Sequence, residues 1–397
     1  MLLSVLSIQG AAYLSQFILA GLLSAESFAI VRTVESALQL LSTIAPWGMS
    51  LLVVRLASQG NSDEESRRLL SSYMGLAGLT ALLLAGVGSL VLVWANGKTV
   101  LSSYFAILIW IAVPVSLSRT ALNYFYGREK FGLISVLTFA TSALSLLVLV
   151  VLTQNWQLDG WVASRYVTEL AILVVAIVFI REKIGSRFVA KAKAIEALAE
   201  GAAISLSLIF RSAIENVPFL ILAYLTANQK EVAIYGLCTL LISGGMVLPA
   251  SINSVLLPRY GSMLKNDSSK FSLLHVKYER YVVLSGVGVA LLLIGLGFIM
   301  SFAFKEKYGA LLPYLALAAF MVPIRAFTTI NANVLFVNQK TATGTKINFI
   351  FAALTIPLTF YLYPGYGLWG VVAGSLAIEI GAAIMFKIYS IRSSGFP

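Results

Sequence analysis

The chain has 397 residues, of which 59% are hydrophobic and only 11% are charged, and its mean hydropathy is +0.90. A soluble globular domain carries about 25% charged residues, so this composition excludes a water-soluble enzyme or binding module. The single cysteine, Cys238, excludes an internal disulfide, and the lone histidine, His275, is expected at a solvated surface. Apolar runs of about 20 residues follow one another along the chain, which predicts an all-α integral membrane protein.

Twelve transmembrane helices are predicted in chain order. The first six lie near residues 2–23, 28–56, 69–94, 101–126, 132–152 and 161–180. Six more lie near residues 199–226, 231–258, 278–304, 309–336, 343–363 and 368–390. The predicted organisation is an N-terminal six-helix lobe (1–180), a cytoplasmic linker (181–198) and a C-terminal six-helix lobe (199–397).

The basic residues are distributed unequally between the two sides of the predicted spans. With residues at the span ends counted in the adjoining segments, 19 of the 28 Lys and Arg residues lie on the side of the N-terminus, 4 on the opposite side and 5 deeper within spans. Lys and Arg favour cytoplasmic segments, so both termini are predicted to face the cytoplasm. The net charge of +11 is therefore mainly an orientation signal and not an indication of nucleic-acid binding. Contact with anionic lipid headgroups is expected as a by-product.

The two predicted lobes resemble each other at a nearly constant offset. At an offset of 210, Gly160, Val162, Ala163 and Glu169 match Gly370, Val372, Ala373 and Glu379, and Asn123 and Lys130 match Asn333 and Lys340. At an offset of 204, Ala29-Ile30 matches Ala233-Ile234. Each lobe has an even number of spans, so the internal repeat is parallel. Two such lobes around a central cavity are typical of a transporter.

Nine charged side chains fall within the predicted spans away from the ends of the spans. A charge at the bilayer centre costs at least about 2.5 kcal/mol, so these groups must face protein or water. Spacing of three or four residues favours structural pairing of Arg32 with Glu35 and of Arg165 with Glu169. The remaining five are Arg119, Arg211, Arg325, Glu215 and Glu379.

Arg119 and Arg325 have no acidic residue in their own spans. A guanidinium group inside a membrane suits an anion such as phosphate, through its planar fork of donors. Pairing of Arg325 with Glu215 or Glu379 across helices is an equally weighted alternative. Polar side chains on the same spans, among them Asn123, Asn331 and Asn333, favour either a hydrated cavity or hydrogen bonds between helices.

Two short turns carry a resemblance to a known family. They are Leu23-Ser24-Ala25-Glu26-Ser27-Phe28 between the first two spans and Gly365-Tyr366-Gly367-Leu368-Trp369-Gly370 before the twelfth. With the chain length and the division into six and six spans, the chain resembles an oligosaccharide flippase. This is the O-antigen (Wzx-type) polysaccharide transporter branch of the multidrug/oligosaccharidyl-lipid/polysaccharide (MOP) exporter superfamily.

The resemblance implies flipping of an undecaprenyl-pyrophosphate-linked oligosaccharide from the cytoplasmic to the outer leaflet of the bacterial inner membrane, by alternating access. The cargo would be a repeat unit of O-antigen, and so of lipopolysaccharide, or of another surface polysaccharide. In this hypothesis a cationic cavity binds the pyrophosphate, through Arg119, Arg211, Arg325, Asn123, Asn331 and Asn333. The residues that would balance the charge of the cavity or couple transport to an ion are Glu215, Glu379, Glu169 and Glu35.

The expected partners are the lipid-linked oligosaccharide, membrane lipids and other polysaccharide-assembly membrane proteins. We expect a monomer that binds no metal, cofactor or nucleic acid. The four glutamates in spans are compatible with coupling to a proton or sodium gradient.

Two alternatives stay open. An ion-coupled antiporter of organic cations, from the same superfamily, would need an unpaired acid, for which Glu379 is the candidate. The first span has no Asp or Glu, which counts against this alternative. A membrane glycan polymerase would need long outer segments for its catalytic groups, whereas 153–160 and 364–367 are short and no catalytic motif occurs. The chain is therefore predicted not to be an enzyme.

Overall fold

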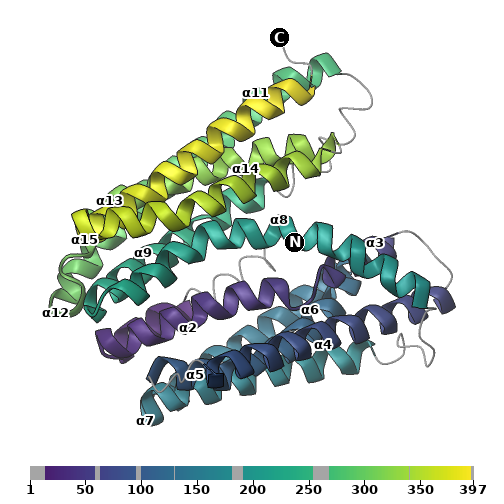
Figure 1. Ribbon diagram of the computed structural model, residues 1–397, viewed down its shortest axis with the longest axis horizontal. Coiled ribbons are helices and arrows are strands. Elements are labelled where there is room, and N and C mark those ends of the chain that lie inside the picture. Colours follow the sequence, from purple (N-terminus) through teal and green to yellow (C-terminus); the bar gives the residue numbers. More distant parts are fainter. Residues whose placement is uncertain are drawn as a thin grey trace. The chain divides into compact units, whose positions relative to one another are not determined.

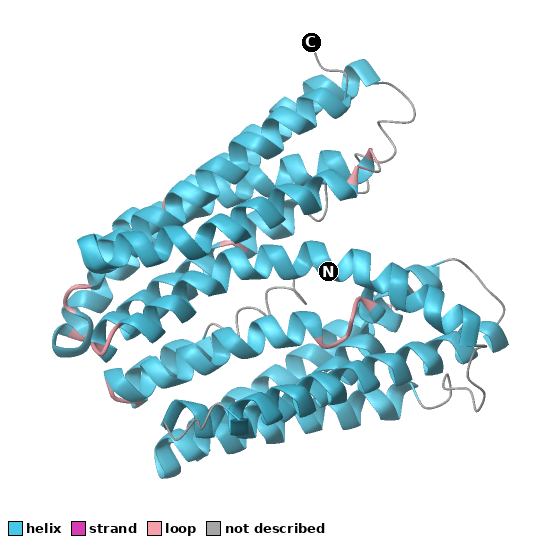
Figure 2. Ribbon diagram, in the orientation of Figure 1, coloured by secondary structure: helices cyan, strands magenta, loops and turns pink. Residues whose placement is uncertain are grey.

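The computed structural model describes residues 14–58, 63–94, 100–128, 130–180, 191–253, 268–338 and 340–394. In these ranges all regular structure is helical and no strand occurs (Figure 2). Eight continuous helices in the described ranges are long and apolar enough to cross a membrane. The predicted all-α, multi-pass membrane fold is therefore confirmed. The chain divides into two compact units, Met1–Ser212 and Ala213–Pro397.

The described part of the first unit begins with helical residues 14–22, and the unit ends at Ser212, inside a helix that continues into the second unit. Its elements in order are α2 (Ala25–Ile44), α3 (Met49–Ser58), α4 (Asp63–Trp94), α5 (Val100–Leu108), η1 (Ile109–Ile111), α6 (Ala112–Gly127), α7 (Phe131–Ile180) and the start of α8 (Lys191–Leu225) (Figure 1). Buried side chains such as Val53, Leu70, Ala121 and Phe125 join α3, α4 and α6 in one core.

The second unit repeats this order of helices. After the end of α8 come α9 (Gln229–Gly245), helical residues 247–253, α11 (Ser268–Ala303), α12 (Lys305–Tyr308), α13 (Leu311–Ala318), α14 (Met321–Val337) and α15 (Thr341–Ser394) (Figure 1). The buried residues Val282, Ala326, Ile330 and Val334 join α11 to α14.

The two longest helices are helical hairpins. Gln157 in α7 has φ 51° and ψ −124°, and Gly367 in α15 has φ 57° and ψ −142°, so the helical path stops there and reverses. In α15, a Cβ atom on Gly374 would lie 3.0 Å from the Leu362 side chain and one on Gly381 would lie 2.6 Å from Phe351, as expected for antiparallel helices. Each hairpin therefore supplies two of the predicted spans.

The turns of the two hairpins confirm the predicted internal repeat. A Cβ atom on Gly160 would lie 2.0 Å from the Leu152 carbonyl oxygen, and one on Gly370 would lie 2.4 Å from the Leu362 carbonyl oxygen. Both members of the second contact lie 210 residues beyond those of the first. In each repeat only a glycine fits where the second helix touches the end of the first.

Two Val-Pro pairs divide predicted spans into shorter helices. Pro114 lies in the first turn of α6, after η1, and Pro323 lies in the first turn of α14, after the break that follows α13. Proline is tolerated in a first turn because the N–H group that it lacks would have no helical acceptor there. Each proline therefore marks a fresh helix start within the membrane.

The second predicted span is divided into two helices, and the described residues cover only part of the first span and of the predicted linker. The span at 28–56 is α2 followed by α3, with a turn at Trp47 (φ 47°) and Gly48 (φ 73°) between them. Residues 2–13 of the first span and residues 181–190 of the linker lie outside the described residues. Residues 191–198 form the first turns of α8, and the boundary between the units falls later in that helix, after Ser212.

Candidate functional site

The best-defined charged cluster of the second unit is centred on Arg325. Its Nε atom donates to Glu379 Oε1 at 2.7 Å, and its Nη1 atom lies 3.7 Å from Glu215 Oε1. The side chain of Arg325 is 10% exposed and that of Glu379 is 1% exposed. Of the two readings of Arg325 left open by the sequence, the structure has the pairing across helices, which joins α14 to α15 and α8.

The local fold explains why these charges tolerate burial. Arg325 stands in the second turn of α14, and its ion pairs with Glu379 and Glu215 balance the buried charges. Beside the cluster, the Tyr235 and Ser375 hydroxyl groups share a hydrogen bond of 2.9 Å between α9 and α15.

Asn333 and Asn331 both lie on α14, but their amides contact different helices. The Asn333 amide donates to Asn253 Oδ1 at 2.9 Å, so it fastens α14 to helical residues 247–253. The Asn331 amide donates to Glu279 Oε1 on α11 at 2.8 Å. Asn331 is fully buried, which suits a side chain that holds helices together.

The charged cluster of the first unit joins α2 to α7. Arg165 Nε lies 3.2 Å from Glu35 Oε1, and Arg165 Nη1 lies 3.8 Å from Glu169 Oε1. The predicted local pair of Arg165 and Glu169 is therefore present, and Glu35 adds a second carboxylate from another helix. Arg32 lies one turn before Glu35 and is half-buried, as is Arg211 on α8, one turn before Glu215.

Arg119 differs from the other charged residues in spans. It lies on α6 with an exposed side chain, and its Nη1 atom donates to the Ser42 carbonyl oxygen at 3.3 Å. No carboxylate of the described residues lies within ion-pair distance of this guanidinium. One turn later on α6, the Asn123 amide donates to the Ser50 carbonyl oxygen at 3.1 Å. Two side chains of α6 thus contact the last turn of α2 and the first turn of α3.

A third polar cluster was not predicted from the sequence. Lys387 Nζ on α15 lies 2.8 Å from both Oε1 and Oε2 of Glu279 on α11, and Ser390 Oγ donates to Asn331 Oδ1 at 2.8 Å. His275, expected at a solvated surface, is instead fully buried. The reason is that α11 begins at Ser268, ten residues before the predicted span, so His275 lies within the helix bundle.

Among the described residues, no three His, Cys, Asp or Glu side chains are placed to hold a metal ion together. The chemistry available in these clusters is thus that of guanidinium, ammonium, carboxylate and amide groups. Such groups recognise anions, sugar hydroxyls or protons.

The sequence profile of the family described as "Polysaccharide biosynthesis protein" matches residues 1–264. No curated protein sequence matches the chain. An inward-facing multidrug resistance MATE family transporter of the MOP superfamily has a TM-score of 0.79 and 14% identity, with 100% of this chain and 99% of that chain covered.

Two further solved structures share the fold. The eukaryotic MATE transporter AtDTX14 has a TM-score of 0.74 and 13% identity, with 99% of this chain and 95% of that chain covered. A MOP superfamily transporter from Pyrococcus furiosus has a TM-score of 0.63 and 12% identity, with 100% of this chain and 94% of that chain covered. The reverse polarity of its binding pocket is said to suggest a different function. At such identities the likeness is one of fold.

Proposed function

Because this chain belongs to the polysaccharide biosynthesis protein family, we propose that it flips a lipid-linked oligosaccharide across the membrane. The chain is a multi-pass transporter of the MOP superfamily and not an enzyme. The proposed cargo is a polyprenyl-pyrophosphate-linked repeat unit of O-antigen or another surface polysaccharide. It moves from the cytoplasmic to the outer leaflet of a bacterial inner membrane by alternating access of the two units.

The observation that carries this proposal is that Arg119 forms no ion pair with a carboxylate of the described residues. A guanidinium within a membrane span is costly unless it finds an anion, and the described residues give this one a hydrogen bond to a carbonyl oxygen but no carboxylate within ion-pair distance. Its remaining donors suit the oxygens of a phosphate, which a planar fork can bind in pairs. We therefore assign Arg119 to the pyrophosphate and Asn123, on the same face of α6, to the polar groups next to it.

Arg325 has a different role in the proposal. Glu379 and Glu215 already neutralise its guanidinium, so binding of a second anion would require one of these carboxylates to move or to be protonated. We assign Arg325 to the coupling step, in which protonation of a partner glutamate frees the arginine for cargo. Glu35 and Glu169 hold Arg165 in the same way in the first unit, and a proton or sodium gradient would supply the energy.

The remaining partners follow from the same proposal. Both termini lie in the cytoplasm, the transporter works as a monomer, and other polysaccharide-assembly proteins deliver and receive the cargo. Arg211 joins the binding groups if the cargo carries an acidic sugar, since α8 runs through both units.

Export of organic cations is the alternative function, because the fold is shared with multidrug MATE transporters. Such a cargo needs a carboxylate that is free of cations. Glu379, the candidate for this role in the sequence, lies 2.7 Å from Arg325. Its charge is therefore already balanced, which favours an anionic cargo over a cationic one.

The test is flipping of a fluorescent polyprenyl-pyrophosphate oligosaccharide in proteoliposomes. The protein is compared with Arg119→Gln and with Lys340→Gln, which removes an exposed charge outside the site. Loss of hydrogen bonds to a charged group is worth about 1.5–3 kcal/mol, so Arg119→Gln should slow flipping by about 10- to 150-fold. Lys340→Gln should flip at the rate of the unchanged protein.

Two outcomes would overturn the proposal. In one, the unchanged protein does not flip the glycolipid but extrudes an organic cation such as ethidium when an ion gradient is applied. In the other, Arg119→Gln flips the glycolipid at the full rate, so that the guanidinium is not the pyrophosphate ligand.

A further inference from the structure

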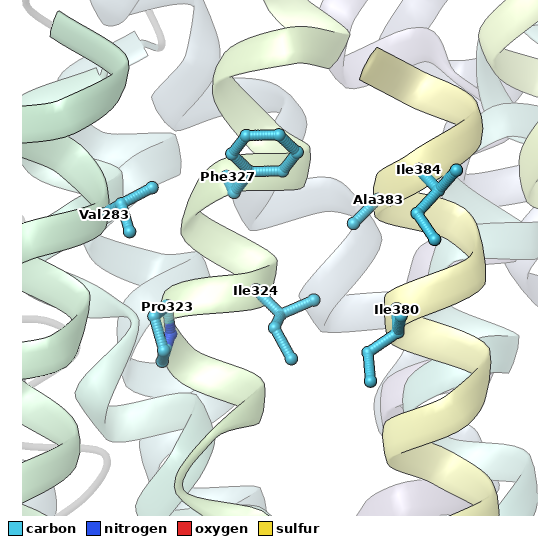
Figure 3. Close-up of a pocket in the computed structure, with 7 residues that line it drawn as sticks. All are labelled: Val283, Pro323, Ile324, Phe327, Ile380, Ala383 and Ile384. Carbon is cyan, nitrogen blue, oxygen red and sulfur yellow. The ribbon is translucent and has the colours of Figure 1, made fainter. Parts of the chain in front are cut away.

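A pocket of about 240 Å³ lies within the second unit, among α11, α14 and α15 (Figure 3). Its lining is entirely apolar: Val283 on α11, Pro323, Ile324 and Phe327 on α14, and Ile380, Ala383 and Ile384 on α15. Ile380 and Ile384 are 41% and 54% exposed, so the pocket opens on an exposed face of helices that cross the membrane. What reaches such an opening in a bilayer is hydrocarbon.

The pocket is closed toward one end of the three helices. One turn from Val283, Gly286 brings α11 against α14, since a Cβ atom there would lie 2.7 Å from Pro323 Cα. This contact closes the gap between α11 and α14 on the side where α14 begins. A chain that enters the pocket therefore ends there and lies along the helices.

The other end of the pocket is polar. Lys387 lies three residues after Ile384, which is about 4.5 Å further along α15. Its Nζ atom stands 5.7 Å from the centre of the Phe327 ring, one of the pocket walls, while two of its three donors go to Glu279. Arg280, also exposed, lies three residues before Val283 on α11. An ammonium and a guanidinium thus stand one turn from the apolar lining.

Side chains typical of a membrane interface follow at the same end. Lys277 lies over the Tyr281 ring at 6.0 Å on α11, and Arg392 lies over the Tyr389 ring at 5.8 Å on α15. Basic residues and tyrosines together occur where membrane helices meet the headgroups. From Ile384 to Arg392 is about 12 Å along the helix, within the roughly 15 Å thickness of the hydrocarbon in one leaflet. The pocket therefore lies at acyl-chain depth.

We propose that this pocket is a binding site for an anionic phospholipid of the leaflet that Arg392 faces. One acyl chain fills the apolar pocket, and the phosphate meets Lys387 and Arg280. An anionic headgroup is favoured because the charge at this end of the pocket is positive. Among the described residues of the three helices, the only acid at this end is Glu279, and Lys387 already neutralises it. None of the residues assigned to cargo binding or coupling lines the pocket, and the inference needs only the membrane location of the chain.

The test is native mass spectrometry of the full-length protein. The protein is taken from vesicles that contain equal amounts of phosphatidylglycerol and phosphatidylethanolamine with a trace of polyprenyl phosphate. Ile384→Trp fills the mouth of the pocket, and Ile380→Trp does so from the previous turn. Leu284→Trp is the matched control, since Leu284 is 63% exposed on α11 and does not line the pocket.

We expect the unchanged protein and Leu284→Trp to retain phosphatidylglycerol, and both pocket variants to retain at least about tenfold less. Arg280→Gln should lower the preference for phosphatidylglycerol over phosphatidylethanolamine about fivefold, the effect of one basic residue near a membrane surface. Size-exclusion profiles identify any variant that fails to fold.

Three results would overturn the inference. Equal retention of phosphatidylglycerol by the folded Ile384→Trp and Ile380→Trp proteins would show that the pocket is not the site. Equal retention of the two phospholipids by the unchanged protein, with no effect of Arg280→Gln, would remove the headgroup assignment. Retention of polyprenyl phosphate in place of phosphatidylglycerol, lost in the pocket variants, would assign the pocket to the cargo tail instead.

Discussion

Gln157 and Gly367, 210 residues apart, hold nearly the same backbone conformation at the turns of the two helical hairpins. Their φ angles of 51° and 57° lie in the region that glycine adopts without strain and that other residues avoid. The second unit thus has the favoured residue at this turn and the first unit does not. Since the geometry persists with glutamine, the packing of the two arms of α7 must hold it in place.

The first prediction is a reciprocal exchange at these turns. Gln157→Gly should stabilise the protein, because a strained non-glycine residue costs about 1–3 kcal/mol. Gly367→Gln should destabilise it by a similar amount. The measurement is the unfolding temperature in detergent for the two variants and the unchanged protein. A fall in this temperature for Gln157→Gly would mean that the glutamine side chain makes a contact that outweighs the strain.

The second prediction separates stability from transport at Arg325. Arg325→Met leaves Glu379, which is 1% exposed, without its cation, and breaking a buried pair costs about 3–5 kcal/mol. The double variant Arg325→Met with Glu379→Gln should recover most of that stability, since no buried charge is left unpaired. Arg119→Gln should change stability by less than about 1 kcal/mol, because its side chain is exposed.

Thermal unfolding and flipping measured on the same four proteins check this prediction. We expect the double variant to be stable but unable to couple transport to a gradient. An active double variant would show that the pair is structural only.

The sequence predicted the architecture well because membrane helices are constrained by length and hydropathy. The predicted outer segments 153–160 and 364–367 contain both hairpin turns, whereas the new helix starts at α6 and α14 fall inside spans that were predicted as continuous. Ion pairs between different helices were harder to predict, because the spacing of residues in the sequence indicates only which side chains are neighbours on the same helix. The ion pair of Glu35 with Arg165 joins residues 130 positions apart.

The Glu279–Lys387 pair was missed for a related reason. Both residues lie near the ends of predicted spans, and Lys387 was counted with the cytoplasmic segments, where charges are expected. Only the three-dimensional packing of α11 on α15 shows that they meet at 2.8 Å. The burial of His275 was missed because hydropathy does not mark the polar first turns of α11 as part of the helix.

The third prediction concerns the contact of α8 with the turn between α2 and α3. A Cβ atom on Gly201 would lie 2.3 Å from the Trp47 carbonyl oxygen, and Trp47 Nε1 donates to the Leu198 carbonyl oxygen at 3.1 Å. Gly201→Ala should therefore push α8 off this turn, at a cost of about 1–3 kcal/mol.

The control for Gly201→Ala is Gly86→Ala on α4, where an added Cβ atom has no neighbour within 4 Å. That change should leave stability the same or raise it by up to about 1 kcal/mol, since alanine is the better helix former. Unfolding temperatures of the two variants compare the effects directly. Equal temperatures would mean that α8 shifts at no cost and that the glycine contact does not fix its position.

The last prediction tests the orientation that the proposed direction of transport requires. Cys238 is fully buried, so the unchanged protein should not react with a membrane-impermeant maleimide. Ala227→Cys places a thiol in the exposed turn between α8 and α9, and Arg392→Cys places one near the end of α15. The excess of basic residues on the side of Arg392 predicts that this end faces the cytoplasm.

In intact cells Ala227→Cys should therefore be labelled, and Arg392→Cys should be labelled only after the membrane is permeabilised. The opposite pattern would place the basic segments outside. Arg392 and Lys277 would then face the outer leaflet, and the phospholipid proposed for the pocket would have to come from that leaflet. The same result would remove the charge argument for cytoplasmic loading of the cargo, because the side rich in Lys and Arg would no longer be the one where the lipid-linked oligosaccharide is made.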